Sequence, residues 1–158
     1  KDFRRWLQKA LYYAQCYFLN TEGKVLVNDS FENRQDGPMV YSLHETLKRR
    51  PTTNELSALD SMSHVDLLDA VAIVLEEYSG QELVDFSHCS QPYLDTKFKA
   101  VISIDKMKND FGKNEFERNF ISRVKEELLE IEKQNLEMDV LLPDSLYDSS
   151  RDWKVEFD

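Results

Sequence analysis

The fold of this chain is decided by the stretch Gln8-Lys9-Ala10-Leu11-Tyr12-Tyr13-Ala14-Gln15. Alanine, leucine, lysine and glutamine are good helix formers, so the stretch predicts a helix. Apolar side chains recur at helical spacing on both sides of it, which extends the predicted helix over residues 2 to about 19. Three tyrosines widen its apolar surface, so we expect a central helix with neighbours on more than one side.

A second short stretch, at residues 36–39, reads Asp-Gly-Pro-Met. Gly37 can adopt a positive φ, whereas Pro38 fixes its own φ and disfavours the α region for the residue before it. The sequence therefore predicts a sharp corner here. We expect this corner to launch a second helix over residues 41–47 and to set the angle between the two helices.

Between these stretches lies a short region that favours strands. Residues 24–27 read Lys-Val-Leu-Val, and Phe31 follows the turn-forming residues 28–30. Because two short strands cannot form a core by themselves, the domain must depend on its helices. The predicted fold class is mainly α: a compact helical domain with one small β-hairpin or short extended arms, plus a long amphipathic C-terminal helix.

The most apolar helix is predicted for residues 65–78. It is apolar nearly all round, so we expect it to be buried at the centre of the domain. Ser63 is the expected N-cap of this helix, and Gly80 is the residue expected to end it. A further helix restarts at residues 79–82, and residues 101–104 form a β-like run or buried connector.

The character of the chain changes after Gly112. Asn114 is a suitable N-cap with Glu117 at the third helical position, which predicts a helix of about two dozen residues. Its apolar stripe is narrow and suits a single groove, so it either folds back onto its own domain or docks on another chain. We therefore divide the chain into a helical domain (1–112) and a C-terminal helix with an acidic tail (113–158). The stripe consists of Phe116, Phe120, Val124, Leu128 and Ile131.

The charge of the chain excludes several classes of function. The 30 acidic residues outnumber the 20 basic ones, which gives a net charge of −10 and disfavours direct binding of nucleic acid. The longest apolar run, at residues 70–75, is too short to cross a bilayer. Cys16 and Cys89 do not form the disulfide framework of a small secreted protein. We expect a cytoplasmic protein that binds no membrane.

Candidates for catalysis or metal binding are weak. His88 precedes Cys89, but neighbouring side chains usually point apart, whereas catalytic pairs meet in space. The same two residues supply only two of the four ligands that a structural zinc ion takes. Phosphate-binding loops need clustered glycines, and the four glycines here are scattered. We expect no enzymatic activity and no cofactor, with His88 acting as a helix-end imidazole bonded to a backbone carbonyl.

Three motifs in the same order carry a resemblance to a known family. Its members typically show a Gln-Lys-Leu-Leu-Tyr-x-Ala-Gln pattern, a Gly-Pro corner, and a Thr-His pair followed by Pro-Trp. Here these stand at residues 8–15, at Gly37-Pro38, and at Ser87-His88 and Pro92-Tyr93. In this respect the chain resembles the Panacea domain, the SocA-like antitoxin family, over roughly residues 1–112. It departs from the family pattern at Asp36, where members carry an aromatic residue.

The resemblance implies a binding module whose partner is a protein toxin that it neutralises by direct contact. Some members resemble proteolytic adaptors, which implies a protease as a further partner. The alternative is an acidic interaction protein of phage or mobile-element origin that blocks or scaffolds a basic partner. Self-association stays open as well. The expected partner surface consists of Tyr13, Tyr17, Tyr41, His44, His88, Tyr93, Phe116 and Phe120.

Overall fold

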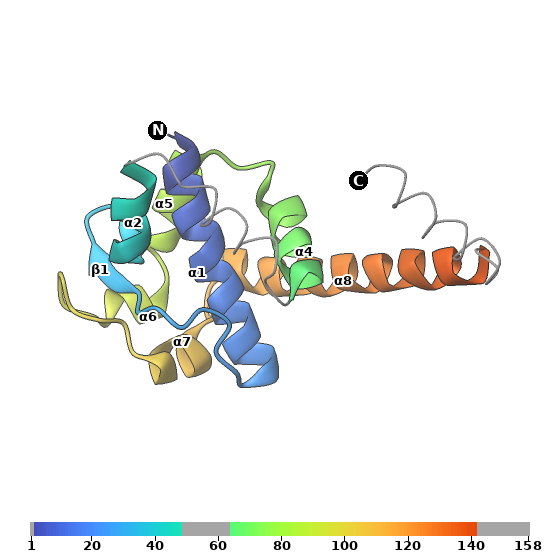
Figure 1. Ribbon diagram of the computed structural model, residues 1–158. Coiled ribbons are helices and arrows are strands. Elements are labelled where there is room, and N and C mark those ends of the chain that lie inside the picture. The colour runs from blue at the N-terminus through green and yellow to red at the C-terminus, as the bar shows by residue number, and fades with distance from the viewer. Residues whose placement is uncertain (1, 49–63, 142–158) are drawn as a thin grey trace.

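The computed structural model of the protein describes residues 2–48 and 64–141. This part of the chain is mainly helical, with a two-stranded antiparallel hairpin and a long C-terminal helix (Figure 1). The predicted fold class is therefore confirmed. The helices are α1 (Asp2–Glu22), α2 (Tyr41–Lys48), α4 (Val65–Leu75), α5 (Gly80–Ser87), α6 (Gln91–Leu94), α7 (Ile104–Asp110) and α8 (Glu115–Leu141), and the strands are β1 (Glu32–Arg34) and β2 (Gly37–Met39).

Helix α1 lies at the centre of the domain, where it packs against α4, α5, α7 and β2 (Figure 1). Its aromatic side chains are buried on more than one face, since Tyr12, Tyr13 and Tyr17 all belong to the hydrophobic core. The ring of Tyr12 meets those of Phe31 and Phe111 edge-on, at centroid distances of 5.8 and 6.5 Å. The first helix is thus the element around which the other described helices assemble, as its sequence indicated.

The prediction that the helix at residues 65–78 is the central one was wrong. Helix α4 ends at Leu75 and packs against α1 and α8. Away from these contacts, the side chains of Val65 and Ile73 are 49% and 41% exposed. The apolar pattern all round the helix does not reveal that only one side of it meets neighbours, because single exposed apolar residues are common on protein surfaces.

The predicted ends of α4 also differ from those observed. Gly80 does not end α4 but begins α5. Ser79 caps α5 in a capping box, since its hydroxyl accepts from the Glu82 amide and the Glu82 carboxylate accepts from the Ser79 amide, both at 3.1 Å. His64 stands at the N-cap of α4, and the predicted cap Ser63 lies outside the described residues.

The hairpin lies further along the chain than the sequence predicted. Its strands pair Glu32 with Met39 and Arg34 with Gly37, so Gln35 and the next residue form the turn. Residues 24–27 do not form a strand. Their β propensity is met in another way, because a side chain of α1 pairs with their backbone, as described below.

A short segment around Val101 lies along β1. The Ile102 amide donates to the Phe31 carbonyl at 2.8 Å, and the Asn33 amide donates to the Ala100 carbonyl at 2.9 Å. Val101 forms an antiparallel bridge with Glu32. The predicted β-like connector is therefore the outer edge of the hairpin.

Gly37 has a φ of +97°, which confirms that this corner requires a glycine. The corner does not launch α2 directly, however. Gly37 and Pro38 form the start of β2, and α2 begins at Tyr41. A proline is tolerated here because β2 is an edge strand.

Helix α8 has two parts with different surroundings. Asn114 caps it as predicted, with its side-chain oxygen 2.8 Å from the Glu117 amide. The first part packs on the domain, where Phe120 and Val124 are 1% and 0% exposed. The stripe thus folds back onto its own domain. The last turns extend away from the domain and leave Leu136 exposed (Figure 1).

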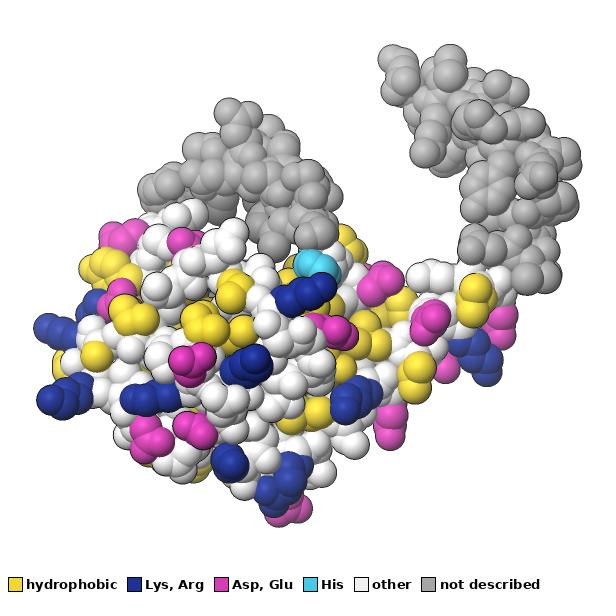
Figure 2. Space-filling model, turned by 90° about the horizontal axis from the view of Figure 1, so that it is seen from below, with side chains coloured by type: hydrophobic (Ala, Val, Ile, Leu, Met, Phe, Trp, Pro, Cys, Tyr) yellow, Lys and Arg dark blue, Asp and Glu magenta, His cyan; other side chains and the backbone are white. Residues whose placement is uncertain are grey.

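Charged side chains cover the domain without separating by sign. On the face in Figure 2, Lys and Arg side chains are scattered among Asp and Glu and form no continuous basic surface. Apolar side chains continue along the projecting part of α8 (Figure 2). In the part of the chain that the structure describes, no helix combines the length and the apolar character needed to span a membrane.

Candidate functional site

Four of the eight residues predicted to contact a partner meet around the tip of the hairpin. The rings of Tyr41 and His44 lie 5.9 Å apart, and the Arg34 guanidinium lies over the Tyr41 ring at 4.8 Å. The rings of His88 and Tyr93 lie 5.3 Å apart. We call these five side chains, Arg34, Tyr41, His44, His88 and Tyr93, the hairpin surface.

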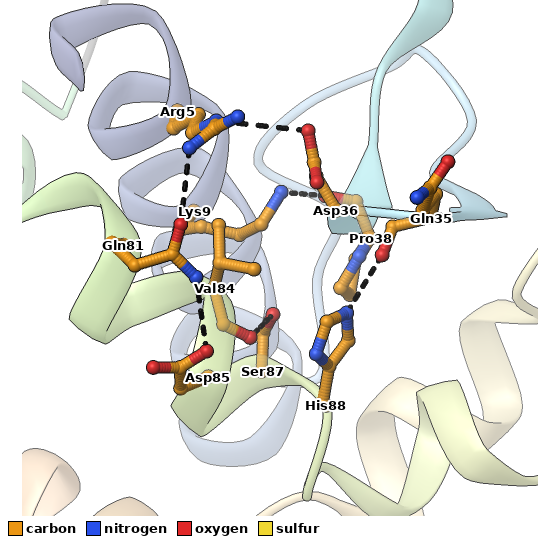
Figure 3. A network of polar contacts seen from close by, with 10 residues as sticks. All are labelled: Arg5, Lys9, Gln35, Asp36, Pro38, Gln81, Val84, Asp85, Ser87 and His88. Atoms are coloured by element: carbon orange, nitrogen blue, oxygen red, sulfur yellow. Dashed lines mark hydrogen bonds and ion pairs between the residues drawn. The ribbon is translucent and has the colours of Figure 1, made fainter.

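The tip of the hairpin is anchored through its backbone oxygens. The Tyr93 hydroxyl donates to the Arg34 carbonyl at 2.9 Å. His88 Nε2 lies 2.8 Å from the Gln35 carbonyl (Figure 3). Because a carbonyl only accepts, His88 carries a proton on Nε2 in this contact. The prediction that His88 is a helix-end imidazole bonded to a backbone carbonyl is confirmed.

Helix α1 holds the neighbouring backbone with buried amide side chains, a role that the sequence analysis missed. The Gln8 amide donates to the Val40 carbonyl and accepts from the Val40 amide, both at 3.0 Å, as a neighbouring strand would. Gln15 binds the backbone of Leu26 and Val27 in the same manner, at 2.8–3.0 Å. The spacing of the two glutamines could have revealed this role. They stand two helical turns apart, among the core positions of α1.

Lys9 is the third buried polar side chain of α1. Its Nζ donates to the Pro38 carbonyl at 2.9 Å (Figure 3). Burial lowers the pKa of Lys9 to about 7, although the nearby carboxylate of Asp36 acts in the opposite direction. The Pro38 carbonyl of the hairpin therefore accepts a hydrogen bond from an amine that changes its charge near neutral pH.

A pocket of about 180 Å³ opens beside the hairpin. At its edge, Arg5 Nε lies 3.6 Å from the Asp36 carboxylate, and Arg5 Nη1 donates to Gln81 Oε1 at 3.0 Å (Figure 3). The pocket adjoins the hairpin surface and shares His44 with it. Its lining consists of Arg4, Arg5, Gln8, Lys9, Asp36, Met39, His44 and Leu47.

The other four predicted residues lie between α1 and α8. The ring of Tyr13 meets those of Phe116 and Phe120 at 5.4 and 5.3 Å, and Tyr17 meets Phe120 at 6.4 Å. Phe116 also stacks on Phe86 at 4.1 Å. These rings attach α8 to α1, so a partner reaches Tyr13, Tyr17 or Phe120 only if α8 moves away.

Glu117 stands in the first turn of α8 and is wholly buried. Its Oε1 accepts from the amides of Gly112 and Lys113 at 2.9 and 3.2 Å, whereas Oε2 has no partner among the described residues. Burial raises the pKa of Glu117, and the nearby Ser90 hydroxyl and the backbone hydrogen bonds only partly oppose this. The Glu117 carboxylate therefore connects α8 to the backbone that follows α7. Its burial costs more free energy when it is charged than when it is protonated.

Glu117→Gln is expected to flatten the pH dependence of stability. Because the folded pKa is raised, the folded state holds this proton longer than the unfolded chain, so the wild type loses stability as pH rises from about 4.5 through the folded pKa. Glutamine keeps the Oε1 acceptor and removes the titration. Urea unfolding of both proteins between about pH 4 and pH 8 measures the difference, and parallel curves would contradict this account of Glu117.

The Cys and His side chains that were considered for catalysis have separate surroundings. Burial raises the pKa of the Cys16 thiol, which keeps it protonated. The Cys89 thiol faces the Asp85 carbonyl at 3.8 Å, while His88 faces the hairpin. Within residues 2–48 and 64–141, no group of three or more His, Cys, Asp or Glu side chains is arranged to hold a metal ion.

Comparison with known proteins identifies the family. No curated protein and no solved structure matches the chain significantly. One family model, described as antitoxin SocA-like, Panacea domain, matches residues 7–94, which is more than half of the chain. The match extends from α1 to the end of α6 and includes every residue of the hairpin surface. The chain therefore belongs to the SocA-like antitoxin family of Panacea domains.

Proposed function

We propose that this protein is a non-enzymatic antitoxin that neutralises a protein toxin by direct contact through the hairpin surface. Membership of the family indicates a role of the toxin–antitoxin type with a protein partner. The observation that carries the proposal is the cluster at the hairpin. There the Arg34 guanidinium lies over the Tyr41 ring, and the His44 ring lies 5.9 Å from Tyr41, beside an anchored turn.

The chemistry of this cluster suits a protein interface. Tyrosine and arginine are enriched among the residues that contribute most to binding. Tyr41 is 44% exposed and carries the Arg34 guanidinium on its ring. Because Tyr93 and His88 hold the turn in place, little conformational entropy is lost when a partner binds.

The expected effect of Tyr41→Ala is a loss of toxin binding of about 30-fold or more, as for a binding hot spot of roughly 2 kcal/mol. The chain is expressed in a bacterial host with the product of each neighbouring small reading frame, and growth and co-purification are measured. Ile73→Ala is the matched control, because Ile73 is 41% exposed on α4. Equal neutralisation by both variants, at unchanged melting temperature, would contradict the role of the hairpin surface.

A second candidate function is delivery of the bound toxin to a protease. The last turns of α8 extend away from the domain and expose Leu136 and Met138 (Figure 1). A helix of this kind offers apolar anchors to a second protein while the hairpin surface holds the first. In this account residues 1–112 bind the toxin, and residues 113–158 add the contact with the protease.

A further inference from the structure

The pocket beside the hairpin is rich in cations, although the chain as a whole is acidic. Arg4 and Arg5 contribute two guanidinium groups from α1, and His44 contributes an imidazole from α2. Lys9 also borders this pocket, although its side chain is wholly buried. Asp36 is the one carboxylate in the lining. A single acid among these groups leaves the pocket with an excess of positive charge in a protein of net charge −10.

Lys9 is not neutralised by the protein itself. Its ammonium form has three N–H donors, and the structure gives it one acceptor, the Pro38 carbonyl at 2.9 Å. The nearest acid, Asp36, is within 4 Å of Arg5 and forms no such ion pair with Lys9 among the described residues. A wholly buried ammonium with spare donors is costly, and a negative charge held nearby reduces that cost.

The remaining walls of the pocket distinguish between kinds of anion. Met39 and Leu47 supply aliphatic surface, and Gln8 already uses its amide on Val40. Such walls suit the methylene groups of an acidic side chain.

We propose that this pocket is a carboxylate-binding site that receives an Asp or Glu side chain of the protein partner. The carboxylate binds the partly exposed guanidinium of Arg5, and its methylene groups pack on Met39 and Leu47. Its charge also acts on the nearby buried amine of Lys9. The source of the carboxylate depends on the proposed function, whereas the pocket itself is tested without any partner.

The amine of Lys9 supplies an additional measurement. With a pKa of about 7, most Lys9 side chains are neutral near pH 8, and a bound carboxylate favours the charged form. Binding is therefore expected to take up nearly one proton at about pH 8 and little at about pH 6. Arg5 on α1 and Asp36 on the hairpin act on the charge of Lys9, and Ser87 on α5 lies with Lys9 beside Gly37. Arg4 on α1 and His44 on α2 line the same pocket.

The test is a titration of the full chain with sodium acetate, with sodium chloride at equal ionic strength as the salt control. The amide resonances of Gly37 and Met39 are expected to shift saturably, with a dissociation constant on the order of 1–50 mM. Calorimetry in two buffers of different ionisation enthalpy measures the proton uptake. Arg5→Gln and Lys9→Met are each expected to weaken binding about tenfold or more, whereas Asp36→Asn strengthens it.

Several variants separate this site from general salt effects. Lys125→Met removes an exposed cation from α8 and is expected to change nothing. In His44→Gln, the proton uptake that accompanies acetate binding is expected to be the same as in the wild type. Such a result would show that the proton is taken up by Lys9 and not by His44. If Lys9→Met does not fold, Arg5→Gln decides the question, because Arg5 is partly exposed. No saturable shift with acetate, tighter binding of inorganic phosphate, or full binding in Arg5→Gln would each overturn the site.

The link to the partner is tested separately by toxin neutralisation. A partner that inserts its carboxylate here is neutralised less well by Arg5→Gln. If Arg5→Gln loses acetate but neutralises fully while Tyr41→Ala fails, the partner does not use the pocket and the hairpin surface remains the binding site. If Tyr41→Ala also neutralises fully while acetate binds, the proposed function fails and the pocket stands.

Discussion

Gly37→Val is expected to lower the free energy of unfolding by roughly 2–6 kcal/mol, a large part of the stability of a small domain. A β-branched residue at a φ of +97° is strained by roughly 1–3 kcal/mol. A Cβ at this position would also lie 2.3 Å from Ser87 Oγ and 2.9 Å from Lys9 Cε, which adds roughly 1–3 kcal/mol of overpacking. Thermal or urea unfolding measures the loss.

Gly23→Val is the matched control. Gly23 has a similarly positive φ of +68°, but a Cβ there would meet only the end of the Lys108 side chain, at 3.8 Å. It carries the backbone strain without the clash, so it should cost less than Gly37→Val. In Gly37→Ala, the further change Ser87→Gly is expected to recover the part that comes from the contact with Ser87 Oγ. Equal costs at the two glycines would show that the close contact under the hairpin does not matter.

Truncation after Gly112 is expected to prevent folding. It removes the aromatic side chains that fill the space beside Tyr13, and burial of Phe120 alone is worth roughly 3–5 kcal/mol. It also removes Glu117, which accepts from the Gly112 amide. The shortened chain should aggregate or give no cooperative unfolding transition in circular dichroism.

Truncation after Ile131 provides the comparison. Ile131 is the last residue of the stripe that packs against the core, so this shorter chain should keep a melting temperature close to that of the full chain. The two truncations also test the predicted division at residue 112. A stable, cooperatively folding chain of residues 1–112 would support that division and contradict the packing role given to the start of α8.

The elements that were predicted correctly depend on local signals. Helix formers around Gln8, the cap at Asn114 and the glycine at position 37 each favour one local structure whatever surrounds them. The hairpin was expected too early, because the β propensity of residues 24–27 does not show that Gln15 supplies their hydrogen-bond partner. Its true strands contain Gly37 and Pro38, which disfavour strands.

The candidate site was predictable only in part. Tyr41, His44, His88 and Tyr93 were chosen because they stand at or beside the motifs of the family, and the fold brings them to one hairpin. Tyr13 was chosen because tyrosine is enriched at interfaces and Phe120 because it belongs to the apolar stripe, yet these two pack against each other. An apolar stripe shows that a helix has a partner surface but not whether that surface belongs to the same chain. The buried Lys9 gave no local signal, because its role depends on where the hairpin lies.

The anchoring of the hairpin tip through backbone oxygens has an evolutionary consequence. Tyr93 and His88 bind the carbonyls of Arg34 and Gln35, and every amino acid supplies the same carbonyl. The side chains at these two positions are therefore free to diverge without loss of the anchor. Descendants of this protein can alter the tip, and with it the partner, while the tyrosine, the histidine and the glycine at position 37 keep the scaffold constant.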